Sequence, residues 1–130
     1  MDIDEALAYI RDNPGGVLAT IMPDGRPHLT VVFAVPIEGA LWISSTQDRI
    51  KTKNLRRDPR ATFTSGSSAW VAVEGMVALQ DGDDVLERMR RYYRAARGEH
   101  PDWDDYDAAM VRDRRLILEL VPERAYGYTG

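Results

Sequence analysis

The sequence predicts a mainly β fold, a small six-stranded antiparallel barrel of Greek-key type with short flanking helices. Six short runs rich in β-branched and aromatic residues are separated by turn residues, which is typical of strands in such a barrel. The first three runs have no helix-length connection between them, whereas parallel strands need one. No phosphate-binding glycine motif follows a strand, so a doubly wound parallel sheet is disfavoured.

The first half of the chain supplies a helix and three strands. Ile3, Leu7 and Ile10 recur at helical spacing until residues Asn13–Gly16 break the pattern, which predicts a short amphipathic helix. Residues Pro23–Arg26 predict a hairpin turn, because proline presets φ and the glycine can take a positive φ. The strands on either side of this turn, and the third strand after it, are expected at Val17–Ile21, Leu29–Val35 and Leu41–Ser45.

The second half of the chain supplies three more strands and two helices. Residues Asp81–Arg97 predict an arginine-rich helix with apolar residues at helical spacing, and a shorter helix is expected around Tyr106. Residues Ala125–Tyr128 are expected to form a separate terminal edge segment. The remaining strands are expected at Ala61–Ser65, Trp70–Leu79 and Leu116–Val121.

One segment, Arg49–Arg60, concentrates positive charge against the trend of the chain. It carries six basic side chains and one acidic one, whereas the whole chain has a formal net charge of -4. We expect an anion at this segment, and the electrostatics alone leave open a phosphate, a nucleic acid or an acidic protein. Asp48 is a plausible N-cap for a short helix here, and the helix should end at Asp58, before Pro59.

The predicted basic helix has two different faces. At about 100° per residue, Ile50 and Leu55 flank one side, and Lys51 lies between them. A lysine among apolar positions should either extend to solvent or reach an anion in a partly enclosed pocket. The opposite face is expected to carry Arg49, Thr52, Lys53 and Arg56.

Composition excludes several classes of protein. The 130 residues fit a single domain spanning 1–130, and no apolar run approaches the ~20 residues of a membrane helix. The acidic N-terminal residues are unlike a secretory signal, so we expect a cytoplasmic protein. Without cysteine there is no disulfide, thiolate nucleophile or iron–sulfur cluster, and two histidines are too few for a zinc site. We therefore expect no protein-held metal.

Several stretches together resemble the pyridoxamine 5′-phosphate oxidase-like superfamily of FMN-binding split β-barrels. Within that superfamily the resemblance is strongest to the actinobacterial branch that binds coenzyme F420, a deazaflavin. The run from Lys51 to Arg60, with its Asp-Pro-Arg ending, is the most specific part. The C-terminal substrate signature of the pyridoxamine phosphate oxidases is not found, which disfavours vitamin B6 oxidation. The other stretches are Gly16–Thr20, Asp24–Pro27, Val73–Gly75, Gly98–Tyr106 and Met110–Arg115.

The resemblance implies a homodimer with two cofactor sites between the subunits, the ring over the sheet and the phosphate at the basic helix. No catalytic side chain is expected, because the deazaflavin itself carries the hydride. The implied phosphate-side residues are Arg49, Lys51, Thr52 and Lys53. Further negative charge would meet Arg56, Arg57 and Arg60, and the strand residues Thr30, Val31 and Val32 would border the ring.

These observations lead us to expect an F420-dependent oxidoreductase that transfers a hydride to a small apolar substrate with an activated double bond. The apolar residues Phe33–Pro36 suit a hydrophobic substrate pocket. Two alternatives keep the fold: an FMN-dependent flavoprotein, and a carrier that binds F420 without catalysis. The basic surplus after Lys51 favours F420, whose lactyl-oligoglutamate tail adds negative charge beyond the phosphate. Nucleic-acid binding is disfavoured, because the rest of the chain is strongly acidic.

Overall fold

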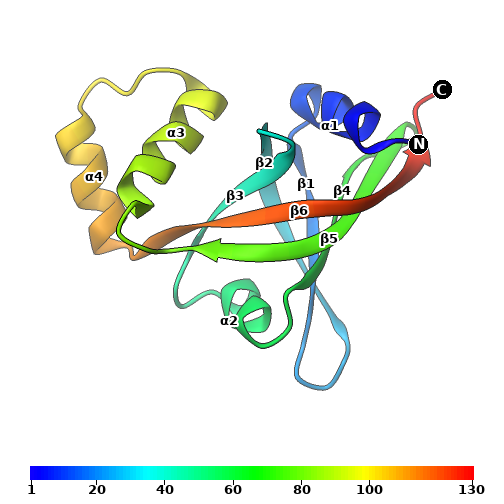
Figure 1. The fold of residues 1–130 in the computed structure, drawn as a ribbon, viewed down its shortest axis with the longest axis horizontal. Coiled ribbons are helices and arrows are strands. Elements are labelled where there is room, and N and C mark those ends of the chain that lie inside the picture. The colour runs from blue at the N-terminus through cyan, green and yellow to red at the C-terminus, as the bar shows by residue number, and fades with distance from the viewer.

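The computed structural model describes all residues 1–130 and confirms the predicted mainly β fold (Figure 1). Six antiparallel strands close into a barrel in the order β1-β2-β3-β6-β5-β4. The strands are β1 (Gly15–Ile21), β2 (Pro27–Ile37), β3 (Ala40–Thr46), β4 (Arg60–Gly66), β5 (Trp70–Gln80) and β6 (Arg115–Tyr128). The helices are α1 (Ile3–Asp12), α2 (Ile50–Arg57), α3 (Val85–Arg97) and α4 (Trp103–Arg112). None of these helices combines the length and the apolar character that crossing a membrane demands.

The core has two parts, which the helices cover from different sides (Figure 1). The larger cluster fills the barrel, and α1 adds Ala6, Leu7 and Ile10 to it. The smaller cluster lies between β2, β3 and the pair α3 and α4, where Trp42 and Met89 are buried. Burial of these apolar side chains is the main force that holds the helices against the barrel.

The C-terminal strand is longer than the sequence pattern predicts. The residues Ala125–Tyr128, expected to be a separate edge segment, are the continuous end of β6 and pair with β5. The register shifts between Glu74 and Gly75, opposite Pro122. Proline has no backbone N–H to donate to a neighbouring strand, and a bulge is one of the few places where a strand tolerates it. The proline therefore lies at an irregularity within β6 and does not end the strand.

Strands β2 and β3 separate partway along their length. They pair only from Ala34↔Ile43 to Ile37↔Ala40, whereas β1 pairs with β2 over Pro27–Phe33. The remainder of β3, from Ser44 to Thr46, pairs with β6 alone. The first half of β2 therefore has one edge that β3 does not cover, and we call it the open edge.

Backbone groups of β2 alternate between its two edges, as in any antiparallel strand. The N–H of Ala34 donates to the carbonyl of Pro14, on the β1 side. Alternation then directs the N–H and C=O groups of Leu29, Val31 and Phe33 to the open edge. The carbonyl of Phe33 accepts a hydrogen bond of 3.0 Å from the hydroxyl of Tyr92 on α3.

Helix α2 is fixed to the barrel by buried polar groups. The Thr52 hydroxyl donates to the carbonyl of Thr46 at 2.7 Å and lies 2.8 Å from the Ser45 hydroxyl oxygen. The Asn54 side chain donates to the Thr20 hydroxyl at 3.0 Å. The helix is consequently rotated from the predicted orientation, with Thr52 fully buried and Ile50 51% exposed. Hydrogen bonds to strand ends decide this orientation, because buried polar groups need partners.

Thr52→Val should destabilise the fold, although valine has nearly the same shape as threonine. The change removes both hydrogen bonds of a buried hydroxyl and leaves the Thr46 carbonyl without this donor, which costs about 1–3 kcal/mol of unfolding free energy. Urea unfolding followed by circular dichroism measures the change. Lys53→Ala, on the exposed side of the same helix, should change stability by less than about 0.5 kcal/mol. Equal stabilities of the two variants would contradict the anchoring role.

Candidate anion-binding site

The N-terminus of α2 lies next to the open edge and lacks a side-chain cap. The N-cap residue is Arg49, and the predicted cap by Asp48 is wrong. The carboxylate of Asp48 instead accepts a hydrogen bond of 2.5 Å from the Thr46 hydroxyl. No acidic residue lies in the first helical turn. The first N–H groups of α2 and the positive end of its dipole are therefore available to an anion.

A hollow of about 330 Å³ joins this helix end to β2. We call it the phosphate hollow. It brings together three residues that the sequence predicted for one site, Arg49 and Lys51 from the α2 region and Thr30 from β2. The other residues that line it are His28, Asp48 and Ile50.

Lys51 is the half-buried cation of the phosphate hollow. Burial lowers its pKa below the ordinary 10.5, and the neighbouring charges of Arg49 and Arg115 lower it further. No salt bridge in the structure involves any of these three side chains. Asp48 is the one carboxylate in the wall of the hollow and makes no salt bridge with these cations, so positive charge is in excess there.

Arg115 is a further cation near Lys51 that the sequence reasoning did not assign to the site. It begins β6, opposite Thr46 at the end of β3, and its guanidinium donates to the Ser44 hydroxyl at 3.4 Å. The stretch that contains it contributed only to the family resemblance, because nothing local to the sequence places it beside Lys51. The pairing of β3 with β6 makes it a neighbour of Lys51.

Most of the other predicted basic residues already have partners inside the chain. Arg56 forms a salt bridge of 2.7 Å with Asp81, and Arg60 forms one of 2.7 Å with Asp58. Arg57 donates to the backbone carbonyl of Ile21 and to the Asn54 side chain. Lys53 is exposed and does not line the phosphate hollow. Thr52 is below the surface, with its hydroxyl already engaged.

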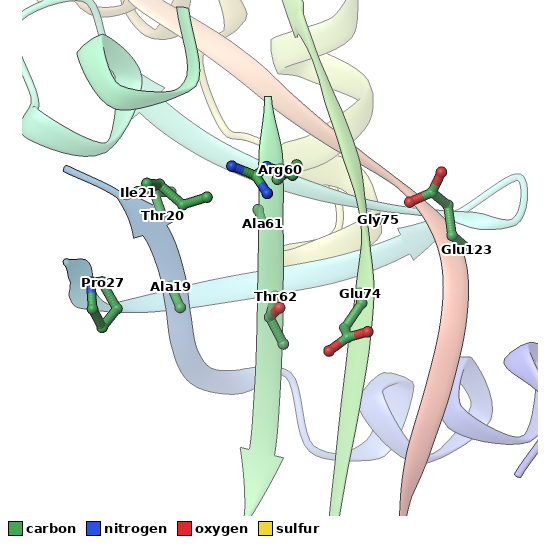
Figure 2. Close-up of a pocket in the computed structure, with 10 residues that line it drawn as sticks. All are labelled: Ala19, Thr20, Ile21, Pro27, Arg60, Ala61, Thr62, Glu74, Gly75 and Glu123. Carbon is green, nitrogen blue, oxygen red and sulfur yellow. The ribbon is translucent and has the colours of Figure 1, made fainter. Parts of the chain in front are cut away.

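Arg60 lies in a different hollow, of about 380 Å³, on the outside of the barrel. Figure 2 shows Arg60, Glu74 and Glu123 around it, on the neighbouring strands β4, β5 and β6. Two carboxylates beside one paired arginine do not favour an anion. The structure therefore does not bring Arg60 together with Lys51.

Of the three residues predicted to border a ring, only Val31 presents its backbone groups to the open edge. Thr30 lines the phosphate hollow, and Val31 is 83% exposed with its backbone groups directed to the open edge. Val32 packs against the barrel core. Leu29 and Phe33 continue an exposed apolar strip on either side of Val31.

An apolar hollow of about 340 Å³ lies at the other end of this strip. The predicted substrate-pocket residues Phe33, Val35 and Pro36 line it from β2, and Ala95 and Ala96 line it from α3. Arg11 and Pro14 complete the wall. Strand β2 thus has the phosphate hollow towards one end and the apolar hollow towards the other.

The wall of the phosphate hollow holds a polar atom that an organic cofactor could meet. No group of three or more metal-ligating side chains is found. The Nδ1 atom of His28, at the wall of the phosphate hollow, is buried and has no partner in the chain. A buried polar atom without a partner is uncommon and marks a place where a ligand can supply the hydrogen bond. The residues present therefore fit a phosphate-bearing cofactor.

Known proteins resemble this chain in sequence and in fold. An F420H(2)-dependent biliverdin reductase of Mycobacterium tuberculosis (strain CDC 1551 / Oshkosh) is 27% identical over 128 residues, which cover 95% of this chain and 86% of that protein. The crystal structure of the conserved hypothetical protein Rv2991 from Mycobacterium tuberculosis superimposes with a TM-score of 0.80 at 26% identity, covering 99% of this chain and 85% of that one. An F420 reductase structure superimposes with a TM-score of 0.69 at 19% identity, covering 91% and 94%, and shows the shared fold.

This chain is therefore related to an F420H(2)-dependent reductase, and the resemblance found in the sequence is confirmed. The profile of the family described as pyridoxamine 5′-phosphate oxidase matches residues 3–128. That match includes every strand of the barrel, the open edge and the phosphate hollow. The chain therefore belongs to the pyridoxamine 5′-phosphate oxidase family.

Proposed function

We propose that this protein is an F420-dependent oxidoreductase that transfers a hydride from the reduced deazaflavin to a small apolar substrate with an activated double bond. The observation that carries the proposal is the convergence of Arg49, Lys51 and the uncapped N-terminus of α2 on a hollow that Thr30 also lines. The relationship to an F420H(2)-dependent reductase supports the choice of deazaflavin over flavin.

Each part of the site has a separate task in this proposal. Lys51 and Arg49 bind the cofactor phosphate, together with the free N–H groups at the start of α2. The open edge of β2 offers the backbone groups of Val31 to the polar rim of the ring, and the apolar strip covers its face. The bound cofactor supplies the hydride, so the protein's contribution is binding, orientation and exclusion of water.

The apolar hollow beside Phe33 is the substrate site in this proposal, because it adjoins the end of the strip on which the ring would lie. We further propose that the protein acts as a homodimer. The exposed side chains of Leu29, Val31 and Phe33 form an apolar strip that a second copy would cover. Covering the strip would also exclude water from the ring.

Truncating Lys51 should weaken cofactor binding much more than truncating its exposed neighbour Lys53. Loss of a charge-assisted hydrogen bond costs about 1–3 kcal/mol, so Lys51→Ala should bind F420 roughly five- to 150-fold more weakly. Fluorescence titration of wild type, Lys51→Ala and Lys53→Ala with F420 and with FMN measures this. We expect wild type to prefer F420. If Lys51→Ala and Lys53→Ala lost the same affinity for F420, Lys51 would not belong to the site. If wild type bound FMN more tightly than F420, the cofactor assignment would be wrong.

Cofactor affinity should fall in alkaline solution, because only the protonated amine of Lys51 attracts phosphate. The pKa of Lys51 lies below 10.5 in the folded protein. In the free protein, the amine therefore loses its proton at a lower pH than an ordinary lysine does, and binding the anion opposes that loss. Lys51→Arg should keep its charge and remove most of the pH dependence. If the affinity of wild type and of Lys51→Arg for F420 fell equally as pH rises, a group other than Lys51 would control the pH dependence of binding.

Turnover distinguishes an enzyme from a carrier of the cofactor. Reduced F420 is incubated with the protein and a panel of cyclic enones, quinones and biliverdin, and reappearance of oxidised F420 is followed by absorbance. At least one acceptor should be reduced by wild type and not by Lys51→Ala at subsaturating cofactor. Ala96→Leu, which fills the apolar hollow, should raise KM for the acceptor and leave F420 affinity unchanged. Tight F420 binding without reduction of any acceptor would support the carrier alternative.

A further inference from the structure

A side chain of α3 lies at the point where β3 leaves β2. The last backbone pair between the two strands is Ala34↔Ile43. In a continued ladder Phe33 would stand opposite Ser44, and the N–H of Ser44 would donate to the carbonyl of Phe33. The hydroxyl of Tyr92 donates to that carbonyl instead, at 3.0 Å. A side chain thus occupies the place of the next backbone hydrogen bond.

The same hydroxyl also meets the backbone of Ser44, on the other strand. Burial raises the pKa of Tyr92 above its ordinary 10.0, and a hydrogen bond from the backbone of Ser44 partly opposes the rise. The charges of Arg97 and Arg115 oppose it as well. The phenol therefore keeps its proton at neutral pH and can donate to Phe33 while it accepts from Ser44. It bridges two strands that no longer pair with each other.

The packing of α3 fixes the position of Tyr92. Its ring packs against the smaller core cluster, between β2, β3 and the two C-terminal helices. Met89, one helical turn earlier, is buried in that cluster. The carbonyl of Met89 accepts a hydrogen bond of 2.7 Å from the hydroxyl of Tyr106 on α4. Because these contacts hold α3 against the strands, the Tyr92 hydroxyl has a defined place between them.

A second set of contacts keeps the strands apart further along. The carbonyl of Thr46 accepts from the N–H of Arg49 at 3.3 Å and from the hydroxyl of Thr52 at 2.7 Å. These bonds occupy the acceptor that would face the N–H of Val31 if the ladder continued in the same register. The gap between β2 and β3 is therefore bounded by Tyr92 at one end and by α2 at the other.

We propose that Tyr92 is a positioning residue, whose hydroxyl keeps β3 away from Phe33 and so leaves the backbone of the open edge free to meet the ring of the cofactor. This inference rests on the proposed function. Without the hydroxyl, the carbonyl of Phe33 and the N–H of Ser44 both lose a partner and pair with each other, because unsatisfied backbone groups are costly. Pairing then extends by one step, and the N–H of Phe33 is no longer available to a ligand.

Tyr92→Phe tests the inference, because it removes the hydroxyl and keeps the ring. In isotope-labelled protein, nuclear magnetic resonance should show a cross-strand nuclear Overhauser effect (NOE) between the amide protons of Phe33 and Ser44 in the variant and not in wild type. The variant should also bind F420 about three- to tenfold more weakly, the effect of losing one neutral hydrogen bond. Tyr92→Leu, which also removes a ring that could hold the strands apart, should show both changes. Circular dichroism checks that each variant is folded.

Tyr93→Phe is the matched control, because Tyr93 is the next residue of α3 and its ring packs against Trp103 and Tyr106 of α4. It should show neither the NOE nor the loss of affinity, and equal changes in this control would overturn the inference. If wild type bound F420 and neither Tyr92 variant showed the NOE, the inference would be wrong and the proposed function would stand. An NOE without any loss of F420 affinity would also overturn it. Failure of wild type to bind F420 would overturn both.

Discussion

The candidate site depends on the separation of β3 from β2 after the pair Ala34↔Ile43. If the two strands paired to their ends, the open edge of β2 would be covered and no backbone group of Val31 would face a ligand. Instead β3 follows β6, and the chain then forms α2 beside the opening. An unpaired strand edge invites association with other chains. Here the edge lies beside a basic helix, so a ligand or a second copy can cover it.

The separation also fixes where positive charge accumulates. Because β3 continues along β6, Thr46 pairs with Arg115, and the chain enters α2 only a few residues later. Arg49, Lys51 and Arg115 are thereby held close enough to lower the pKa of Lys51. A base whose folded pKa is depressed binds fewer protons when folded than when unfolded. Stability should therefore rise with pH as the solution approaches the ordinary lysine value of 10.5. A bound anion would offset the repulsion among these three cations, so ligand binding would also stabilise the fold.

The sequence predicted the features that local pattern and composition control. Strand runs, turns and the basic segment all correspond to observed elements, and the inward position of Lys51 agrees with its half-buried place in the phosphate hollow. The orientation of α2 was predicted less well. At 100° per residue Thr52 shares a face with Arg49, Lys53 and Arg56, which predicted it to be exposed, whereas hydrogen bonds to a strand end bury it. Arg115 could not be assigned, because strand pairing brings it to the site from a distant part of the sequence.

The positive charge counted in the sequence is larger than the charge that a ligand meets, because some arginines are already paired with carboxylates of the chain. Only the unpaired cations are expected to attract an anion. The basic run appears uniform, yet Arg56 and Arg60 are each neutralised by a carboxylate of this chain. Arg114 lies outside the run and has no such partner. An exposed ion pair gives an approaching anion little net attraction, because the carboxylate cancels most of the field of the arginine and salt screens the remainder within about 10 Å. Unpaired cations that share one wall act together, so Arg49 and Lys51 of the phosphate hollow offer an anion more than the paired arginines of the basic run do.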